Sequence, residues 1–181
     1  MTSKNASIIA IPSAKYVLPV LLFAVTSFAS VTTVFGQSKC KFGQFQETYY
    51  SNMEFKGNAA ITRCSSVINH VWSDGDGPSA GGSSSNPKAD GVSGPKLWAH
   101  YSANFVGNFR FSGGTYTFHA KADDGVRVWV GNTLLIDQWN DHAPTEFSQS
   151  IDLSPGDYKV TVQYYQNAGE AVIHVWWDPR Q

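Results

Sequence analysis

Two adjacent aspartates, Asp123 and Asp124, separate one apolar segment from the next. Neighbouring carboxylates repel each other, and consecutive side chains of an extended strand point to opposite faces, so the pair has no packing role there. Calcium prefers oxygen ligands and would balance both charges. The two side chains could converge on one ion only if the chain turned sharply between them, as at a cis peptide bond. The simpler interpretation of Asp-Asp-Gly is an ordinary turn.

Catalysis finds little support in the sequence. It contains no nucleophile elbow, no His-Glu-x-x-His zinc motif and no phosphate-binding loop. Asp137 and Asp141 could be imagined as a glycosidase pair, but two carboxylates so close in sequence are more typical of a solvated loop. We therefore expect no catalytic residues and predict that the protein is not an enzyme. The formal net charge of −1, without a basic cluster, does not indicate a nucleic-acid partner.

The segments that must position these residues alternate between apolar and polar side chains. In residues 157–165 every second residue from Tyr158 to Tyr164 is apolar, and residues 126–130 show the same pattern, which is typical of strands with one buried face. We see no helical period of ten residues or more, and charged residues are only 15% of the chain. The sequence therefore predicts an all-β protein with two packed antiparallel sheets, a β-sandwich. The expected strands lie within residues 41–55, 104–111, 115–122, 126–131, 133–137, 147–153, 157–165 and 170–177.

The N-terminal region predicts export. A basic start is followed by an uncharged stretch from Tyr16 to Ser38, which is typical of a secretory signal peptide over residues 1–36. The alternative is an uncleaved anchor, because such a stretch is long enough to span a bilayer. We expect one domain over residues 37–181, secreted or at the cell surface, with no further membrane contact. Its Gly/Ser/Pro-rich residues 73–95 are expected to form a surface loop.

The chain contains only two cysteines, Cys40 and Cys64. In an exported protein an even cysteine count favours a disulfide, so we predict that these two are bonded. The alternative is two free thiols.

The sequence resembles the PA14 (protective-antigen-type) domain family. Residues 114–139 read GTYTFHAKADDGVRVWVGNTLLIDQW and residues 151–177 read IDLSPGDYKVTVQYYQNAGEAVIHVWW. They are similar to the family's G-x-Y-x-F, S-D-D-G-V-R-L-W-V, L-I-D-x-W and Y-Y-E-N-x-G-x-A motifs, in the same order. The resemblance extends from about Phe45 to Trp177 and departs at residues 104–107, where the family usually has R-W-x-G. It implies a β-sandwich of the PA14 type.

The resemblance also implies a calcium site. In lectin members of the family, such as yeast flocculins and some bacterial adhesins, the aspartate pair carries a cis peptide and binds calcium, and an asparagine with two carbonyls of a second loop completes the ligand shell. Transferred to this sequence, the metal ligands are the side chains of Asp123, Asp124 and Asn167 and the carbonyls of Gly169 and Ala171. Gln166 is a further candidate ligand.

The function that this resemblance implies is calcium-dependent carbohydrate binding by a lectin or adhesin-like module. Sugar hydroxyls would occupy the open calcium positions, and an aromatic ring would stack on the sugar. Trp139 is the first candidate for that ring, ahead of Trp72 and Trp98, and Asn140 and His142 could hydrogen-bond the glycan. The alternative is a PA14 scaffold that serves protein contacts or surface structure without binding sugar.

Overall fold

The computed structural model describes residues 40–73, 76–79 and 97–179. The predicted signal segment, residues 1–36, and most of the predicted loop at 73–95 lie outside these residues. Over the described ranges, no helix has the length and apolar character needed to cross a membrane.

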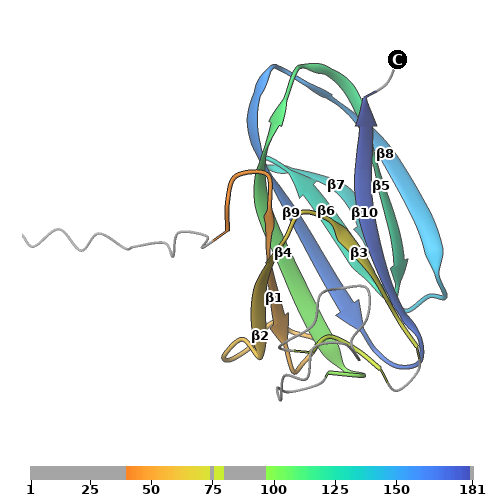
Figure 1. The fold of residues 1–181 in the computed structure, drawn as a ribbon. Helices are drawn as coiled ribbons and strands as arrows, with labels where there is room; N and C mark the ends of the chain where they lie inside the picture. The colour runs from red at the N-terminus through yellow and green to blue at the C-terminus, as the bar shows by residue number, and fades with distance from the viewer. Residues whose placement is uncertain (1–39, 74–75, 80–96, 180–181) are drawn as a thin grey trace, which may run out of the picture. The chain divides into compact units, whose positions relative to one another are not determined.

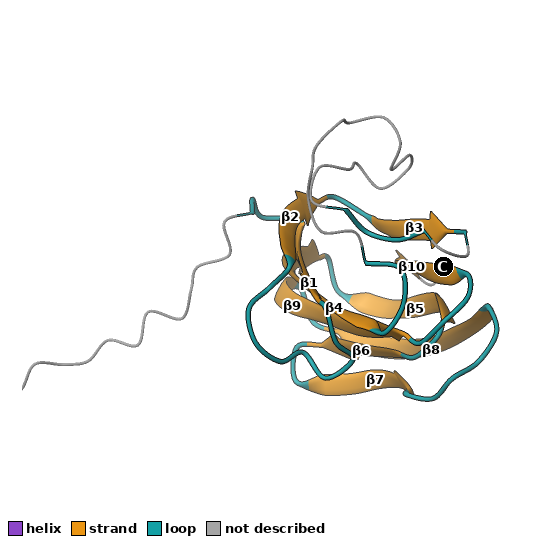
Figure 2. Ribbon diagram, turned by 90° about the horizontal axis from the view of Figure 1, so that it is seen from below, coloured by secondary structure: helices purple, strands orange, loops and turns teal. Residues whose placement is uncertain are grey.

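The described residues form ten strands in two antiparallel sheets, which confirms the predicted all-β sandwich. One sheet has six strands in the order β2-β1-β4-β9-β6-β7, and the other has four in the order β3-β10-β5-β8 (Figures 1 and 2). The strands are β1 (Phe45–Tyr50), β2 (Ile61–Ser65), β3 (Ile68–Trp72), β4 (Tyr101–Phe111), β5 (Gly114–Asp123), β6 (Val126–Val130), β7 (Thr133–Gln138), β8 (Thr145–Leu153), β9 (Gly156–Gln166) and β10 (Ala171–Pro179).

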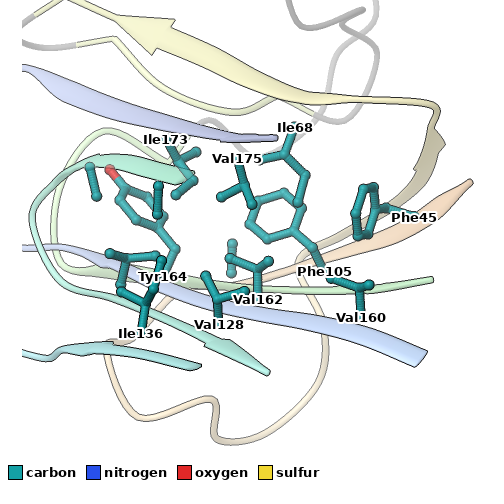
Figure 3. Close-up of a cluster of buried hydrophobic side chains, with 14 of the residues drawn as sticks. Phe45, Ile68, Phe105, Val128, Ile136, Val160, Val162, Tyr164, Ile173 and Val175 are labelled. Atoms are coloured by element: carbon teal, nitrogen blue, oxygen red, sulfur yellow. The ribbon is translucent and has the colours of Figure 1, made fainter. Parts of the chain in front are cut away.

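Alternating side chains of the two sheets meet in one core. In the six-stranded sheet Val128 of β6 lies opposite Val162 of β9, and both are fully buried. Ile173 and Val175 of β10 approach them from the four-stranded sheet (Figure 3). The alternation of apolar and polar residues that predicted these strands therefore identifies the side chains that hold the two sheets together.

Strands β2 and β3 were not predicted. Only Ser66 and Val67 separate them, yet β2 pairs with β1 and β3 pairs with β10, so the chain changes sheets between them. In β3 one of the inward positions is taken by His70, which is fully buried. A polar residue at that position masks the alternation that identifies the other strands.

A buried carboxylate links β1, β2 and β3. Glu47 is fully buried, and its two oxygens contact Arg63 Nε at 2.6 Å and His70 Nε2 at 2.9 Å. Burial raises the pKa of the Glu47 carboxyl, but the hydrogen bond from His70 and the charges of His70 and Arg63 outweigh it, and the pKa lies below its ordinary value. Because His70 belongs to the other sheet, this cluster joins the two sheets as well as the three strands.

Cys40 and Cys64 form a disulfide, as predicted. The bond ties the segment before β1 to strand β2.

Candidate functional site

The aspartate pair lies where β5 ends and the chain crosses to β6. The peptide bond between Asp123 and Asp124 is cis, as predicted. The β7–β8 and β9–β10 loops lie at the same end of the sandwich (Figure 1). Each of the three loops leaves one sheet and enters the other, because β5, β8 and β10 belong to the four-stranded sheet and β6, β7 and β9 to the six-stranded one.

The carboxylate of Asp124 ties the three loops together. Its Oδ2 accepts a hydrogen bond from the backbone N–H of Asn167 at 2.7 Å, and its Oδ1 accepts one from the backbone N–H of His142 at 3.3 Å. Asp124 is buried, so these bonds provide partners that solvent does not. The structure thus places Asn167 beside the aspartate pair, as the resemblance implied.

A third carboxylate, Asp141, joins this group. Its Oδ1 accepts a hydrogen bond from the Tyr165 hydroxyl at 2.7 Å, and its Oδ2 accepts one from the side-chain amide of Asn167 at 2.8 Å. Sequence reasoning did not assign Asp141 to the site, since no sequence pattern shows that this loop meets the β9–β10 loop. Asp137, considered with it, instead contacts the Arg127 guanidinium at 2.6 Å.

Two tyrosines of β9 support the turn that carries the aspartates. The Tyr164 hydroxyl donates to the carbonyl oxygen of Asp123 at 2.5 Å, and the backbone N–H of Tyr165 donates to the carbonyl of Gly125 at 3.0 Å. A Cβ atom on Gly125 would lie only 2.1 Å from Cε1 of Tyr165. Residue 125 must therefore be glycine for the turn to lie this close to β9.

Both aspartates carry unfavourable negative charge. Partial burial, with the charges of Asp124 and Glu170, raises the pKa of Asp123 to about 6, and His142 opposes this. Burial and the charge of Asp141 raise the pKa of Asp124, against the hydrogen bonds from Asn167 and His142. A proton or a bound cation would relieve this repulsion.

The donors at this end of the sandwich suit calcium. The carboxylates, the Asn167 amide and nearby backbone carbonyls are all hard oxygen donors. The described ranges contain no group of three or more His, Cys, Asp or Glu side chains arranged to hold one metal ion. An ion here would thus depend on Asn167 and backbone carbonyls as well as on the aspartates.

Gln166 does not fit the predicted role of a calcium ligand. It is fully buried, its Nε2 donates to the carbonyls of Ala168 and Glu170, both at 2.9 Å, and its Oε1 lies 2.9 Å from the Tyr164 hydroxyl oxygen. Gln166 therefore shapes the β9–β10 loop from inside. Its bonds use neither of the carbonyls assigned to the ion, those of Gly169 in the loop and Ala171 at the start of β10.

The predicted sugar-stacking ring of Trp139 is half-buried among other side chains. The Arg127 guanidinium lies 4.7 Å from the ring centre, and the rings of Tyr165 and Phe55 lie 4.8 and 5.9 Å away. Packing occupies much of this indole and supports the loop. The stacking role considered for Trp72 is wrong, because its side chain is only 3% exposed and belongs to the core.

Asn140 and His142 both lie on the loop after Trp139. Asn140 is exposed, and its side-chain amide donates to the carbonyl of Asp141 at 3.2 Å. The His142 ring is half-buried, with Nδ1 3.0 Å from the carbonyl of Ala143. Asn140 therefore keeps an accessible side chain beside the site, while His142 contributes chiefly through its backbone.

A β-sandwich in which a cis Asp-Asp turn meets an asparagine loop defines the class of the protein. Residues 41–181 match the family model described as PA14 domain, so the chain belongs to the PA14 domain family.

Two relatives above 30% identity are anti-sigma factor proteins. The chain is 32% identical over 135 residues to the anti-sigma-I factor RsgI3 of Acetivibrio thermocellus, a match that covers 73% of this chain and 18% of that protein. A solved anti-sigma factor domain-containing protein is 31% identical with a TM-score of 0.59, over 76% of this chain and 43% of that one. The chain thus spans less than half the length of either protein.

A further solved structure is the PA14 sugar-binding domain from an RTX adhesin, with a TM-score of 0.58 and 18% identity. The match covers 76% of this chain and 90% of that domain. At this identity it shows a shared fold.

Proposed function

We propose that this domain binds carbohydrate through a calcium ion held between the β5–β6 and β9–β10 loops. The observation that carries the proposal is the cis-linked Asp123 and Asp124, joined to the Asn167 loop by a 2.7 Å hydrogen bond. The raised pKa values of both aspartates support it, because a bound cation would compensate carboxylate charges that burial and neighbouring acidic groups make unfavourable. The fold shared with a sugar-binding PA14 domain supports the sugar as ligand.

Asp141 orients the asparagine for this role. The Asn167 amide nitrogen donates to Asp141, and no hydrogen bond from a described residue reaches its Oδ1. That oxygen is therefore free to act as a ligand. Calcium takes six to eight oxygens, so Asp123, Asp124, Asn167 and the carbonyls of Gly169 and Ala171 would leave positions for sugar hydroxyls. When bound, the ion supplies a point at which neighbouring hydroxyls attach.

The proposed activity is binding and not catalysis. A glycosidase would need Asp137 and Asp141 to act as a pair. Asp137 instead contacts Arg127 on the outer face of β6 and β7, and Asp141 bonds Tyr165. We also propose that the domain works outside the cell or on its surface, where the Cys40–Cys64 disulfide is stable.

A second candidate function is protein contact without sugar. It is favoured by the two relatives above 30% identity, both of which are named as anti-sigma factor proteins. In that case the acidic end of the sandwich would be a structural turn or a contact surface.

Calcium titration distinguishes the two functions. Isothermal titration calorimetry should detect calcium binding to the wild type and none to Asp124→Asn, which keeps the side-chain shape but loses the charge. Asp157→Asn is the matched control, because Asp157 pairs with Arg110 on the surface away from these loops. A glycan array with and without EDTA should then show calcium-dependent binding by the wild type and the control. No calcium binding by the wild type would leave the protein-contact function.

A further inference from the structure

A hollow of about 310 Å³ lies on the outer face of the six-stranded sheet. It is formed by β6, β9 and the β6–β7 turn, and it shares no residue with the candidate calcium site. Its lining residues are Trp129, Gly131, Asn132, Lys159, Thr161 and Gln163.

Strand alternation places these side chains outside. Val128 and Val130 on β6 point into the core, so Trp129 between them points away from it. Trp129 lies opposite Thr161 of β9 in the ladder, and Gln163 follows two residues along the same face. At the other end the Gly131 N–H donates to the carbonyl of Lys159 at 2.8 Å. That bond holds the turn against β9 and forms one wall of the hollow.

The indole of Trp129 has no aromatic or cationic partner among the residues that the structure describes. Trp139 contacts Arg127 and Tyr165, and Trp176 stacks between His119 and His174. Within the same described ranges, the polar side chains of the hollow make no hydrogen bonds with other protein groups. The hollow therefore places two amides, a hydroxyl and an ammonium group around an indole, and none of these four polar groups is engaged by another protein group.

This combination suits a sugar. An indole packs against the apolar C–H face of a sugar ring, and amide and hydroxyl groups match its ring of hydroxyls. The volume lies at the lower end of the range for small-molecule sites, enough for roughly one or two sugar rings. Lys159 is the only charged side chain of the lining, so the hollow offers no negative charge to repel an acidic sugar.

We infer that the hollow at Trp129 is a second carbohydrate-binding site, which works without calcium. It does not depend on the proposed function of the loop site. A domain with both sites would bind glycan at the loop end of the sandwich and on the outer face of the six-stranded sheet. Two weak contacts to one polysaccharide would then reinforce each other.

A glycan array probed in EDTA tests the inference, with wild type, Trp129→Ala and Trp98→Ala. Trp98 is 57% exposed and lies outside the hollow, so it controls for loss of a surface indole. We expect EDTA-resistant binding by the wild type and Trp98→Ala, and a loss of about tenfold or more in Trp129→Ala. Gln163→Ala, a smaller change on the same wall, should weaken the same glycans and serves if Trp129→Ala fails to fold.

The inference is overturned if the wild type binds no glycan in EDTA, or if EDTA-resistant binding survives both substitutions in the hollow. If a parallel array with calcium shows no more binding than the array in EDTA, that result counts against the loop site and leaves the inference about the hollow intact.

Discussion

The backbone N–H of Asn167 donates a 2.7 Å hydrogen bond to Oδ2 of Asp124, although 43 residues separate the two in sequence. With the N–H of His142, it anchors the Asp124 carboxylate from two sides. No hydrogen bond from a described residue reaches the side chain of Asp123. The two aspartates therefore differ: Asp124 organises the loops, and Asp123 carries charge that the protein itself does little to compensate.

Replacing Asp123 by asparagine should stabilise the calcium-free protein. The raised pKa of Asp123 means that its ionised form is disfavoured in the folded state, and asparagine resembles the neutral form. Urea denaturation in EDTA at pH 7.5 should give a higher midpoint for Asp123→Asn than for wild type. Calcium should raise the melting temperature of the wild type only. A lower midpoint in EDTA would contradict the unfavourable burial and repulsion assigned to the Asp123 charge, and Asp157→Asn controls for charge removal elsewhere.

Calcium binding should release protons near pH 6. The stabilising contribution of protonated Asp123 is complete below its ordinary pKa of 3.8 and is lost as pH rises through about 6, so below pH 6 calcium must displace a proton. Affinity should therefore fall as pH drops below 6. Calorimetry in buffers of different ionisation enthalpy should show about half a proton released per ion at pH 6 and almost none at pH 8. Equal release at both values would exclude Asp123 as the titrating ligand.

Gly125→Ala should destabilise the protein by about 1–3 kcal/mol, because its Cβ would overlap the Tyr165 ring. Gly156→Ala is the matched control, since its Cβ would meet Tyr158 Cε2 at an ordinary 3.7 Å. That change should leave stability unchanged or raise it by up to about 1 kcal/mol. Urea unfolding measures both variants, and equal stabilities would show that Tyr165 moves aside at little cost.

The disulfide should stabilise the fold by about 3 kcal/mol, the amount expected for a closed loop of this length. Cys40 and Cys64 are 24 residues apart, and neither is needed by the candidate site. Replacing both by serine should lower the urea midpoint while calcium affinity is retained. Thiol counting on the denatured, unreduced protein should find no free thiol, and two free thiols would refute the bond.

Sequence patterns were enough for the strands whose inward positions are all apolar. β6 alternates over its whole length and β9 alternates as far as Tyr164, so the valines of their buried faces could be predicted. β3 could not be predicted, because its buried His70 is acceptable only next to Glu47, 23 residues earlier. No local pattern contains that pairing.

The candidate site, too, could be predicted only in part. The Asp123–Asp124 turn and its approach to Asn167 followed from the resemblance, because both motifs are short and contiguous. Asp141 could not be found, since its role depends on two loops meeting in space. Gln166 was misassigned for a related reason: the sequence does not reveal that an amide beside the site points into the protein.

Each loop of the site also passes from one sheet to the other, and the strands that flank the aspartate and asparagine loops are neighbours in both sheets. β6 pairs with β9 in the six-stranded sheet, with Val126 opposite Tyr164, and β5 pairs with β10 in the four-stranded one, with Asp123 opposite Val172. Either sheet alone would therefore bring Asp124 close to Asn167, so the site does not have to wait for the two sheets to dock. If calcium is mixed with refolding protein, a calcium-sensitive dye should report uptake together with the strand formation that circular dichroism follows, and before the core closes.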